Sequence, residues 1–224
     1  MMGYLGPLLA IVRKDIMLEL RTKDIVVSVS VFSVLVIVIF NFAIDPTPQT
    51  VAFVAPGVLW VAFVFGGVLG LTRSFALEKD GGNLHGILLA PVSRDAIFFG
   101  KMLASFLFMM LVEVMAFAVF AVLFNLSLVE PILLPTAVLA TLGITTLGTV
   151  FSAMAVNTRA REVMLPLLFL PVIVPVIIAV VEATGLLLRD GDMSDIVVWL
   201  SMLAAFDAIF LVVCPFAFSV IVDE

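Results

Sequence analysis

The sequence predicts an all-α integral membrane protein with six transmembrane helices, and three observations support this fold class. Hydrophobic residues make up 64% of the chain and charged residues 12%, whereas soluble domains are about 45–50% apolar and about 25% charged. Six apolar runs reach the ~20 residues that a helix needs to cross a hydrocarbon core of ~30 Å. No segment shows the alternating pattern of a membrane β-barrel. We therefore expect one membrane domain over residues 1–224.

The N-terminal arm, residues 4–24, precedes the first apolar run and has the pattern of an amphipathic helix. On a helix its apolar residues form one stripe, which predicts a helix lying in the membrane interface. A helix packed on other parts of the protein fits the pattern as well. Because the apolar residues come before the charges, the arm does not have the order of a signal peptide. The stripe consists of Leu5, Leu8, Leu9, Val12, Ile16 and Leu20, and the charged residues expected away from it are Lys14, Glu19 and Arg21.

The six apolar runs follow the arm. The expected transmembrane helices are residues 25–44, 51–72, 102–124, 131–156, 163–184 and 196–221. In the second run, Gly66 and Gly67 favour close helix packing over a ligand site. Three prolines are expected to kink the fifth run, which neighbouring helices in a bundle tolerate. Trp60 and Trp199 are expected to anchor their helices at the membrane interface.

The basic residues predict the orientation of the chain. Four lie in the N-terminal arm, four in 73–101 and two in 157–162, and the other connections contain only Arg189. Ten of the eleven therefore fall on one side of the membrane, which the positive-inside rule identifies as cytoplasmic. With six spans, both termini are expected on that side. The net charge of −6 barely affects orientation and gives no reason to expect nucleic-acid binding.

Residues 73–101 form the longest polar interruption of the chain and are predicted to be a cytoplasmic docking loop. The segment is far longer than the ~2–6 residues that most connections need. Its centre is apolar with helical spacing, two glycines open it and Pro91 closes it. A short amphipathic helix displayed on a surface is expected to bind a partner.

Within this loop, the stretch EKDGGNLHGILLAPVSRDAIFFGK resembles the cytoplasmic signature of type-2 ABC exporter permeases. The resemblance implies a coupling helix that docks into a separate ATPase subunit. His85 stands where such loops often carry an acid, and we interpret it as a solvated loop residue rather than a heme ligand. The residues assigned to ATPase coupling are Glu78, Gly82, Leu84, His85, Ile87, Leu88, Pro91, Arg94 and Lys101. A candidate second contact is formed by Arg159, Arg161 and Glu162, although topology alone explains these arginines equally well.

Further stretches narrow the resemblance to the heme exporter protein B family. They are ELRTKD, VIVIFNFA and FSAMAVNTRAREVMLPLLFLPVIVPVIIA, and with the coupling loop the similarity covers nearly the whole chain. The resemblance implies a multi-pass permease in a bacterial inner membrane that serves cytochrome c maturation. It implies an ABC ATPase subunit that binds the ATP, a heme-handling membrane subunit and a second permease copy as partners, with heme as the candidate cargo.

The sequence lacks the motifs of a catalytic chain. Gly100-Lys101 is followed by Met102 and has Asp95 where a P-loop needs its first glycine, so we expect ATP hydrolysis in a partner. A single cysteine, Cys214, excludes an intrachain disulfide and a C-x-x-C-H heme attachment. We predict no catalytic residue, no metal site and no bound cofactor.

Three acidic residues lie within or close to the apolar runs. Glu113 and Asp207 fall near the middle of the third and sixth runs, and Glu182 falls at the outer end of the fifth. A charge at the bilayer centre costs ~2.5–3.5 kcal/mol on insertion scales. Glu113 and Asp207 therefore either line a translocation path or touch a partner subunit, or they are neutral carboxyls that hydrogen-bond a neighbouring helix. For Glu182 we favour the second interpretation.

Three other functions stay open from the residues alone. A type-2 ABC exporter for a lipid, drug or polysaccharide would share the coupling loop. A proton-coupled carrier would use Glu113 and Asp207 without an ATPase. A structural assembly subunit would tolerate substitutions in the loop.

Overall fold

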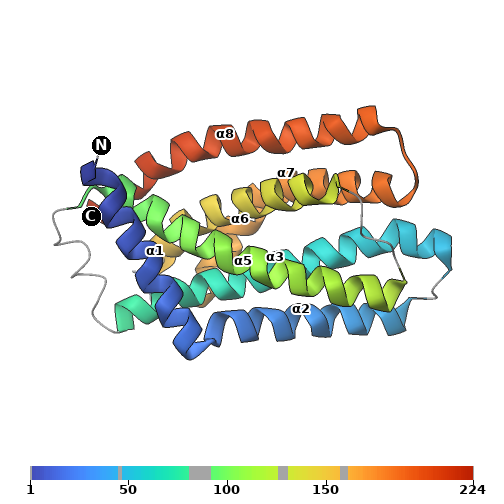
Figure 1. Cartoon of the computed structure of the whole chain (residues 1–224), viewed down its shortest axis with the longest axis horizontal. Helices are drawn as coiled ribbons and strands as arrows, with labels where there is room; N and C mark the ends of the chain where they lie inside the picture. The colour runs from blue at the N-terminus through green and yellow to red at the C-terminus, as the bar shows by residue number, and fades with distance from the viewer. Residues whose placement is uncertain (1, 45–46, 81–91, 126–130, 157–160, 224) are drawn as a thin grey trace.

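The structure is a computed structural model that describes residues 2–44, 47–80, 92–125, 131–156 and 161–223. These residues form helices and no strand (Figure 1). The helices are α1 (Met2–Thr22), α2 (Asp24–Ala43), α3 (Pro48–Asp80), α5 (Arg94–Phe124), α6 (Leu133–Val156), α7 (Arg161–Leu188) and α8 (Met193–Asp223). All but α1 are long and apolar enough to cross a membrane, which confirms the six predicted spans.

The long helices form an up-and-down bundle, and α1 lies across one end of it (Figure 1). The same end holds both chain termini, the last turns of α3 and the first turns of α5 and α7. These are the parts of the chain that carry most of the basic residues. The bundle therefore has a basic end, and its cytoplasmic orientation stays a prediction.

The boundaries of the predicted docking loop, 73–101, are wrong on both sides. α3 remains helical to Asp80 and α5 already begins at Arg94. Charged residues do not interrupt a helix, whereas the glycine pair after Asp80 disfavours one. On the other side, Ser93 has extended backbone and its Oγ accepts a hydrogen bond from the Ala96 amide at 3.4 Å, as an N-cap does. With 33 residues, α3 is about 50 Å long, well beyond the hydrocarbon thickness.

Helices α3 and α6 form the centre of the bundle, because a larger share of each is buried than of the other spans. Small residues let the helices approach closely. A Cβ atom added at Gly66 or Gly70 would lie 2.9 Å from a methyl group of Val29 on α2, and one at Gly67 would lie 2.7 Å from the Met109 methyl of α5. The packing interpretation of Gly66 and Gly67 is confirmed.

Trp60 is not an interface anchor, contrary to the expectation. Its side chain is only 1% exposed, and its Nε1 donates a hydrogen bond to Thr184 Oγ1 on α7 at 3.0 Å. Its ring also packs edge-on against Phe63 and Phe117. The buried hydroxyl satisfies the indole N–H, so the tryptophan does not need the polar interface. Trp199 is half-buried on α8.

Candidate functional site

The predicted coupling residues fall partly outside the described residues. Gly82, Leu84, His85, Ile87, Leu88 and Pro91 lie in the segment 81–91, and Arg159 lies in 157–160; neither segment is described. Glu78 belongs to the last turns of α3, and Arg161 and Glu162 begin α7. Arg94 begins α5, where it is half-buried, and Lys101 lies two turns further on. Coupling by these residues stays a prediction.

Lys101 connects α5 to the N-terminal arm. Its side chain is 2% exposed and its Nζ lies 3.5 Å from Asp15 Oδ2 of α1. The other oxygen of Asp15 lies 3.0 Å from Lys14 Nζ. In this arrangement the ammonium group is inside the protein, beneath α1, so a partner would sense Lys101 through α1 rather than by touching it.

The neighbouring Gly100 explains how α1 reaches this position. A Cβ atom added at Gly100 would lie 3.0 Å from Ile11 Cβ and 3.3 Å from the Leu8 carbonyl oxygen. The glycine therefore lets the α1 backbone lie directly on α5, where Lys101 reaches Asp15. The Gly100-Lys101 pair resembles the end of the coupling signature. In the structure this pair forms the contact of α5 with α1.

Glu19 is buried, although the helical projection placed it away from the apolar stripe. Its side chain is 3% exposed, and its Oε1 accepts a hydrogen bond from the Val26 amide at 2.7 Å. Lys23 between the two helices has a positive φ of 59°, so the chain turns sharply there. The carboxylate thus satisfies a free amide at the start of α2, where negative charge is also favoured by the helix dipole. Glu19 fixes the joint between α1 and α2.

The two faces of α1 differ. Ile11 and Val12 are buried on the bundle, whereas much of the remaining apolar surface is exposed. The exposed apolar residues are Leu5, Leu9, Met17, Leu18 and Leu20. The predicted stripe is therefore divided between a protein-packed face and an uncovered face, and the interfacial position of α1 stays a prediction that this exposure favours.

Glu113 and Asp207 are both buried, and both lie against α6. Thr141 Oγ1 of α6 donates a hydrogen bond to Glu113 Oε2 at 2.6 Å, while Glu113 Oε1 has no partner among the described residues. Asp207 comes from α8, and its Oδ1 would lie 2.8 Å from a Cβ atom added at Gly143 of α6. Neither oxygen of Asp207 has a hydrogen-bond partner within the described residues.

The environment of the two acids favours different interpretations for each. The Thr141 hydrogen bond favours the interpretation of Glu113 as a carboxyl that bonds a neighbouring helix. Asp207 meets a glycine and apolar side chains instead, and an unpartnered buried polar group is costly. Asp207 is therefore the stronger candidate for a role in another conformation of the bundle.

Glu182 has a local partner at the other end of the bundle. Its Oε2 lies 3.7 Å from Arg189 Nη2. Arg189 also donates from Nε to the Gly185 carbonyl oxygen at 2.9 Å and lies over the Phe53 ring at 4.8 Å from its centroid. Glu182 is therefore paired with a cation at the end of its own helix, and the expectation of a neutral carboxyl that hydrogen-bonds a neighbouring helix is wrong. Within the described residues, no group of three or more His, Cys, Asp or Glu side chains is placed to hold a metal ion.

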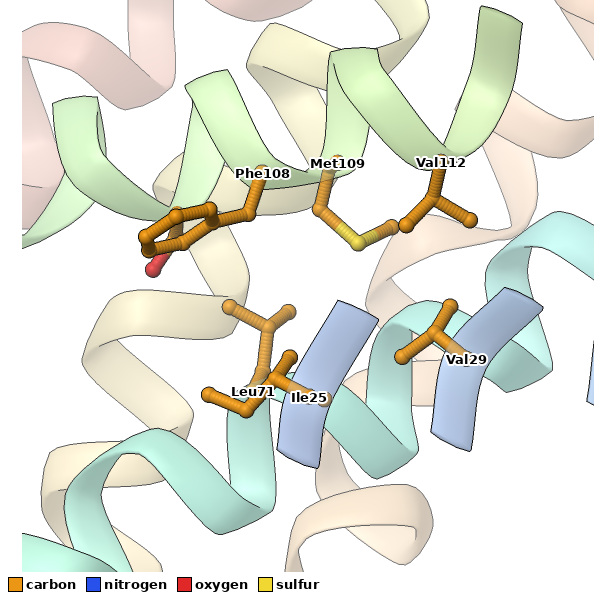
Figure 2. Close-up of a pocket in the computed structure, with 8 residues that line it drawn as sticks. Ile25, Val29, Leu71, Phe108, Met109 and Val112 are labelled. Atoms are coloured by element: carbon orange, nitrogen blue, oxygen red, sulfur yellow. The ribbon is translucent and has the colours of Figure 1, made fainter. Parts of the chain in front are cut away.

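A small pocket, with a cavity volume of about 20 Å³, lies between α2, α3 and α5. Figure 2 shows Ile25 and Val29 of α2 and Leu71 of α3 facing Phe108, Met109 and Val112 of α5 across it. Gly70 and Ser105 complete the lining. The sequence did not reveal this pocket, because it depends on how three helices meet.

The chain is similar to known proteins over nearly its whole length. The family model described as CcmB protein matches residues 7–223. The heme exporter protein B of Rhodobacter capsulatus is 31% identical over 209 residues, which cover 93% of this chain and 94% of that protein. The heme exporter protein B of Paracoccus denitrificans is 32% identical over 187 residues, covering 83% and 84%, and that of Pseudomonas aeruginosa is 30% identical over 190 residues, covering 84% of each.

Proposed function

The chain belongs to the CcmB protein family, and from this membership we infer that it is a membrane permease subunit of a heme-export and cytochrome c maturation system. The observation that carries this inference is the match of family and heme exporter relatives over nearly the whole six-span bundle. The family match favours this function over a type-2 exporter for a lipid, drug or polysaccharide. The membrane it occupies is the bacterial inner membrane.

ATP is hydrolysed by a separate ABC ATPase subunit in this proposal, and the chain transmits the resulting motion. The segment 73–101 docks onto the ATPase, and two permease copies form one complex with it and with a heme-handling membrane subunit. The 33-residue length of α3 supports this role, because a continuous helix carries a displacement from the docking segment to the centre of the bundle. The ion pair between buried Lys101 and partly buried Asp15 links α1 to α5, so in this proposal α1 moves together with α5.

The motion serves heme export or the release of the heme-loaded chaperone at the periplasmic side. A partner shifts a conformational equilibrium only by its differential affinity for the two states. The ATPase must therefore contact segment 73–101 differently before and after hydrolysis. Asp207, which is buried without a hydrogen-bond partner in the described residues, is the side chain that would gain most from a state in which α6 and α8 separate.

The test is a pull-down of the detergent-solubilised chain, followed by mass spectrometry of the partners. The wild type is compared with a Leu84→Asp, Leu88→Asp double variant. A matched control carries Leu134→Asp, an exposed residue at the start of α6 at the opposite end of the bundle. We expect the wild type and the control to bring down an ATPase and a heme-handling subunit, and the double variant to lose the ATPase alone.

Recovery of no ATPase with any of the three proteins would contradict the proposal. Transport driven by a pH gradient through Glu113 and Asp207 would then be the function to test, in vesicles that contain this chain alone. Equal recovery of the ATPase with all three would reject the docking role of segment 73–101 while leaving family membership intact.

A further inference from the structure

We propose that Asp207 is a proton-binding site, which holds its proton while α8 packs on α6 and releases it when the two helices separate. The carboxyl group lies inside the bundle. Its side chain is 3% exposed, and neither oxygen has a hydrogen-bond partner within the described residues. In the apolar interior of a membrane protein, an ionised carboxylate without a partner costs far more than a neutral carboxyl group. The buried Asp207 therefore carries a proton.

The contacts of Asp207 are apolar on two sides and leave no donor for a carboxylate. Its Oδ1 would lie 2.8 Å from a Cβ atom added at Gly143, so the oxygen packs directly against this glycine of α6. The same Cβ atom would lie 3.4 Å from a methyl group of Val176 on α7 and 3.7 Å from the Phe206 ring. Neither a methyl group nor a ring carbon donates a hydrogen bond. The site thus accommodates the neutral form of the acid.

Among the described residues, no Lys or Arg lies in the middle of a span, where a cation could offset a charge on Asp207. Helix α6 has no ionisable residue from Leu133 to Val156. On α7 the ionisable residue nearest to Val176 is Glu182, about 9 Å further along the axis, and it pairs with Arg189. The other ionisable residues of α7 lie in its first turn and are Arg161 and Glu162.

Helix α5 also packs on α8, and its buried acid, Glu113, lies on the opposite side of α6 from Asp207. Glu113 bonds Thr141, whereas Asp207 contacts Gly143. Two residues correspond to about 200° around a helix and about 3 Å along it, so α6 separates the two acids. The other ionisable residues of α5 and α8 lie one or more turns away along the bundle and are Arg94, Asp95, Lys101, Asp195, Cys214 and Asp223.

Separation of α8 from α6 is linked to the proton because it admits water. Helix α8 lies at the edge of the bundle, and only a small share of it is buried (Figure 1). Water solvates the ionised carboxylate once the helices part, so a rise in pH favours the separated state. The shift is about tenfold per pH unit over the range in which only the packed state holds the proton. The link to ATP rests on the proposed function, whereas protonation of the packed state does not.

Infrared spectroscopy tests the protonation of Asp207. The detergent-solubilised full chain is measured at neutral pH, where the C=O stretching band of a protonated carboxyl group is distinct from that of a carboxylate. Asp207→Asn keeps the size of the side chain and cannot ionise. The controls are Glu113→Gln, for the other buried acid, and Asp195→Asn, for an exposed acid of α8. We expect Asp207→Asn to lose a band that both controls retain.

The distance between spin labels on α6 and α8 tests the release of the proton. In a Cys214→Ala background, Leu134→Cys and Val198→Cys place the labels at exposed positions near the beginning of the two helices. The distance is measured by pulsed electron paramagnetic resonance at increasing pH, with Asp207 and with Asp207→Asn. We expect the longer distance to gain about tenfold in population per pH unit with Asp207, and to gain nothing with Asn.

Equal protonated-carboxyl bands in the wild type and Asp207→Asn would overturn the proton site. A band that depends on Asp207, together with a label distance that does not change with pH, would overturn release on separation. Neither measurement uses an ATPase or heme. A failed pull-down of the ATPase would therefore reject the proposed function and leave both results on Asp207 standing.

Discussion

A buried hydrogen bond between polar side chains links α5 to α6. Thr141 Oγ1 donates to Glu113 Oε2 at 2.6 Å between two helices, whereas Thr145 Oγ1 donates to the Thr141 carbonyl oxygen of its own helix at 2.7 Å. Both threonines are fully buried. Removal of the Thr141 hydroxyl leaves the Glu113 carboxyl group without a hydrogen-bond partner among the described residues. Removal of the Thr145 hydroxyl leaves no carboxyl group without a partner.

We predict that Thr141→Val lowers the stability of the bundle by about 1 kcal/mol, in the range of hydrogen bonds between membrane helices. Thr145→Val keeps every contact between helices, and its effect should be about half a kcal/mol or less because only an intrahelical bond is lost. The measurement is unfolding of the detergent-solubilised protein by denaturant. Equal effects of the two substitutions would show that the hydrogen bond to Glu113 contributes nothing to stability.

The positions of both intramembrane acids along their helices could be predicted from the sequence, but the residues that contact them could not. Hydropathy alone places Glu113 and Asp207 in the middle of apolar runs. Glu113 contacts Thr141 and Asp207 contacts Gly143 because of how each helix is rotated about its axis. The sequence determines this rotation poorly when a helix is apolar on all sides. Glu19 was misplaced for a related reason, because its role depends on the turn at Lys23.

Helix α1 packs on α5 around Gly100 and Lys101, while Glu19 links it to α2. Gly100 admits the α1 backbone and Lys101 pairs with Asp15. A side chain at Gly100 would press on Ile11 and on the Leu8 carbonyl oxygen, and a backbone atom yields less easily than a flexible side chain. The position of α1 therefore depends on a glycine that lies in another helix.

We predict that Gly100→Leu detaches α1, because overpacking of this kind costs about 1–3 kcal/mol. Tryptic cleavage after Arg13 and Lys14 should then become severalfold faster in the detergent-solubilised protein. Gly57→Leu is the matched control, since a Cβ atom added at Gly57 has nothing within 4 Å. An unchanged cleavage rate in Gly100→Leu would show that the position of α1 does not depend on its contact with Gly100.

At the scale of elements, the six spans were predictable and their ends near the docking segment were not. Apolar runs determine where a helix crosses the membrane, but helix termini depend on glycines and caps. The polar stretch 73–80 was therefore assigned to a loop although it continues α3, and α5 begins at Arg94, after its N-cap Ser93, well before the apolar run at 102. The contact of α1 with Gly100 and Lys101 was not predicted, because the sequence assigned this Gly-Lys pair to the coupling loop.

The molecule as a whole is asymmetric along the bundle axis. One end holds α1, both termini, the last turns of α3 and the first turns of α5 and α7, and the other end holds the last turns of α2 and α7 (Figure 1). The proposed docking of an ATPase requires the first end to face the cytoplasm. The positive-inside rule predicts this orientation from loop charge alone.

Orientation can be measured by labelling single cysteines in intact cells with a maleimide that does not cross the inner membrane. In a Cys214→Ala background, Thr47→Cys and Asp192→Cys lie at exposed positions of the far end, and Asp95→Cys lies at an exposed position near the start of α5. We expect the first two to be labelled in cells with a permeable outer membrane. Asp95→Cys should react only after the inner membrane is broken, because a charged maleimide cannot pass the hydrocarbon core. Labelling of Asp95→Cys in intact cells, with Thr47→Cys and Asp192→Cys protected, would show the opposite orientation. Segment 73–101 would then lie on the periplasmic side, where no ATP-hydrolysing partner could reach it.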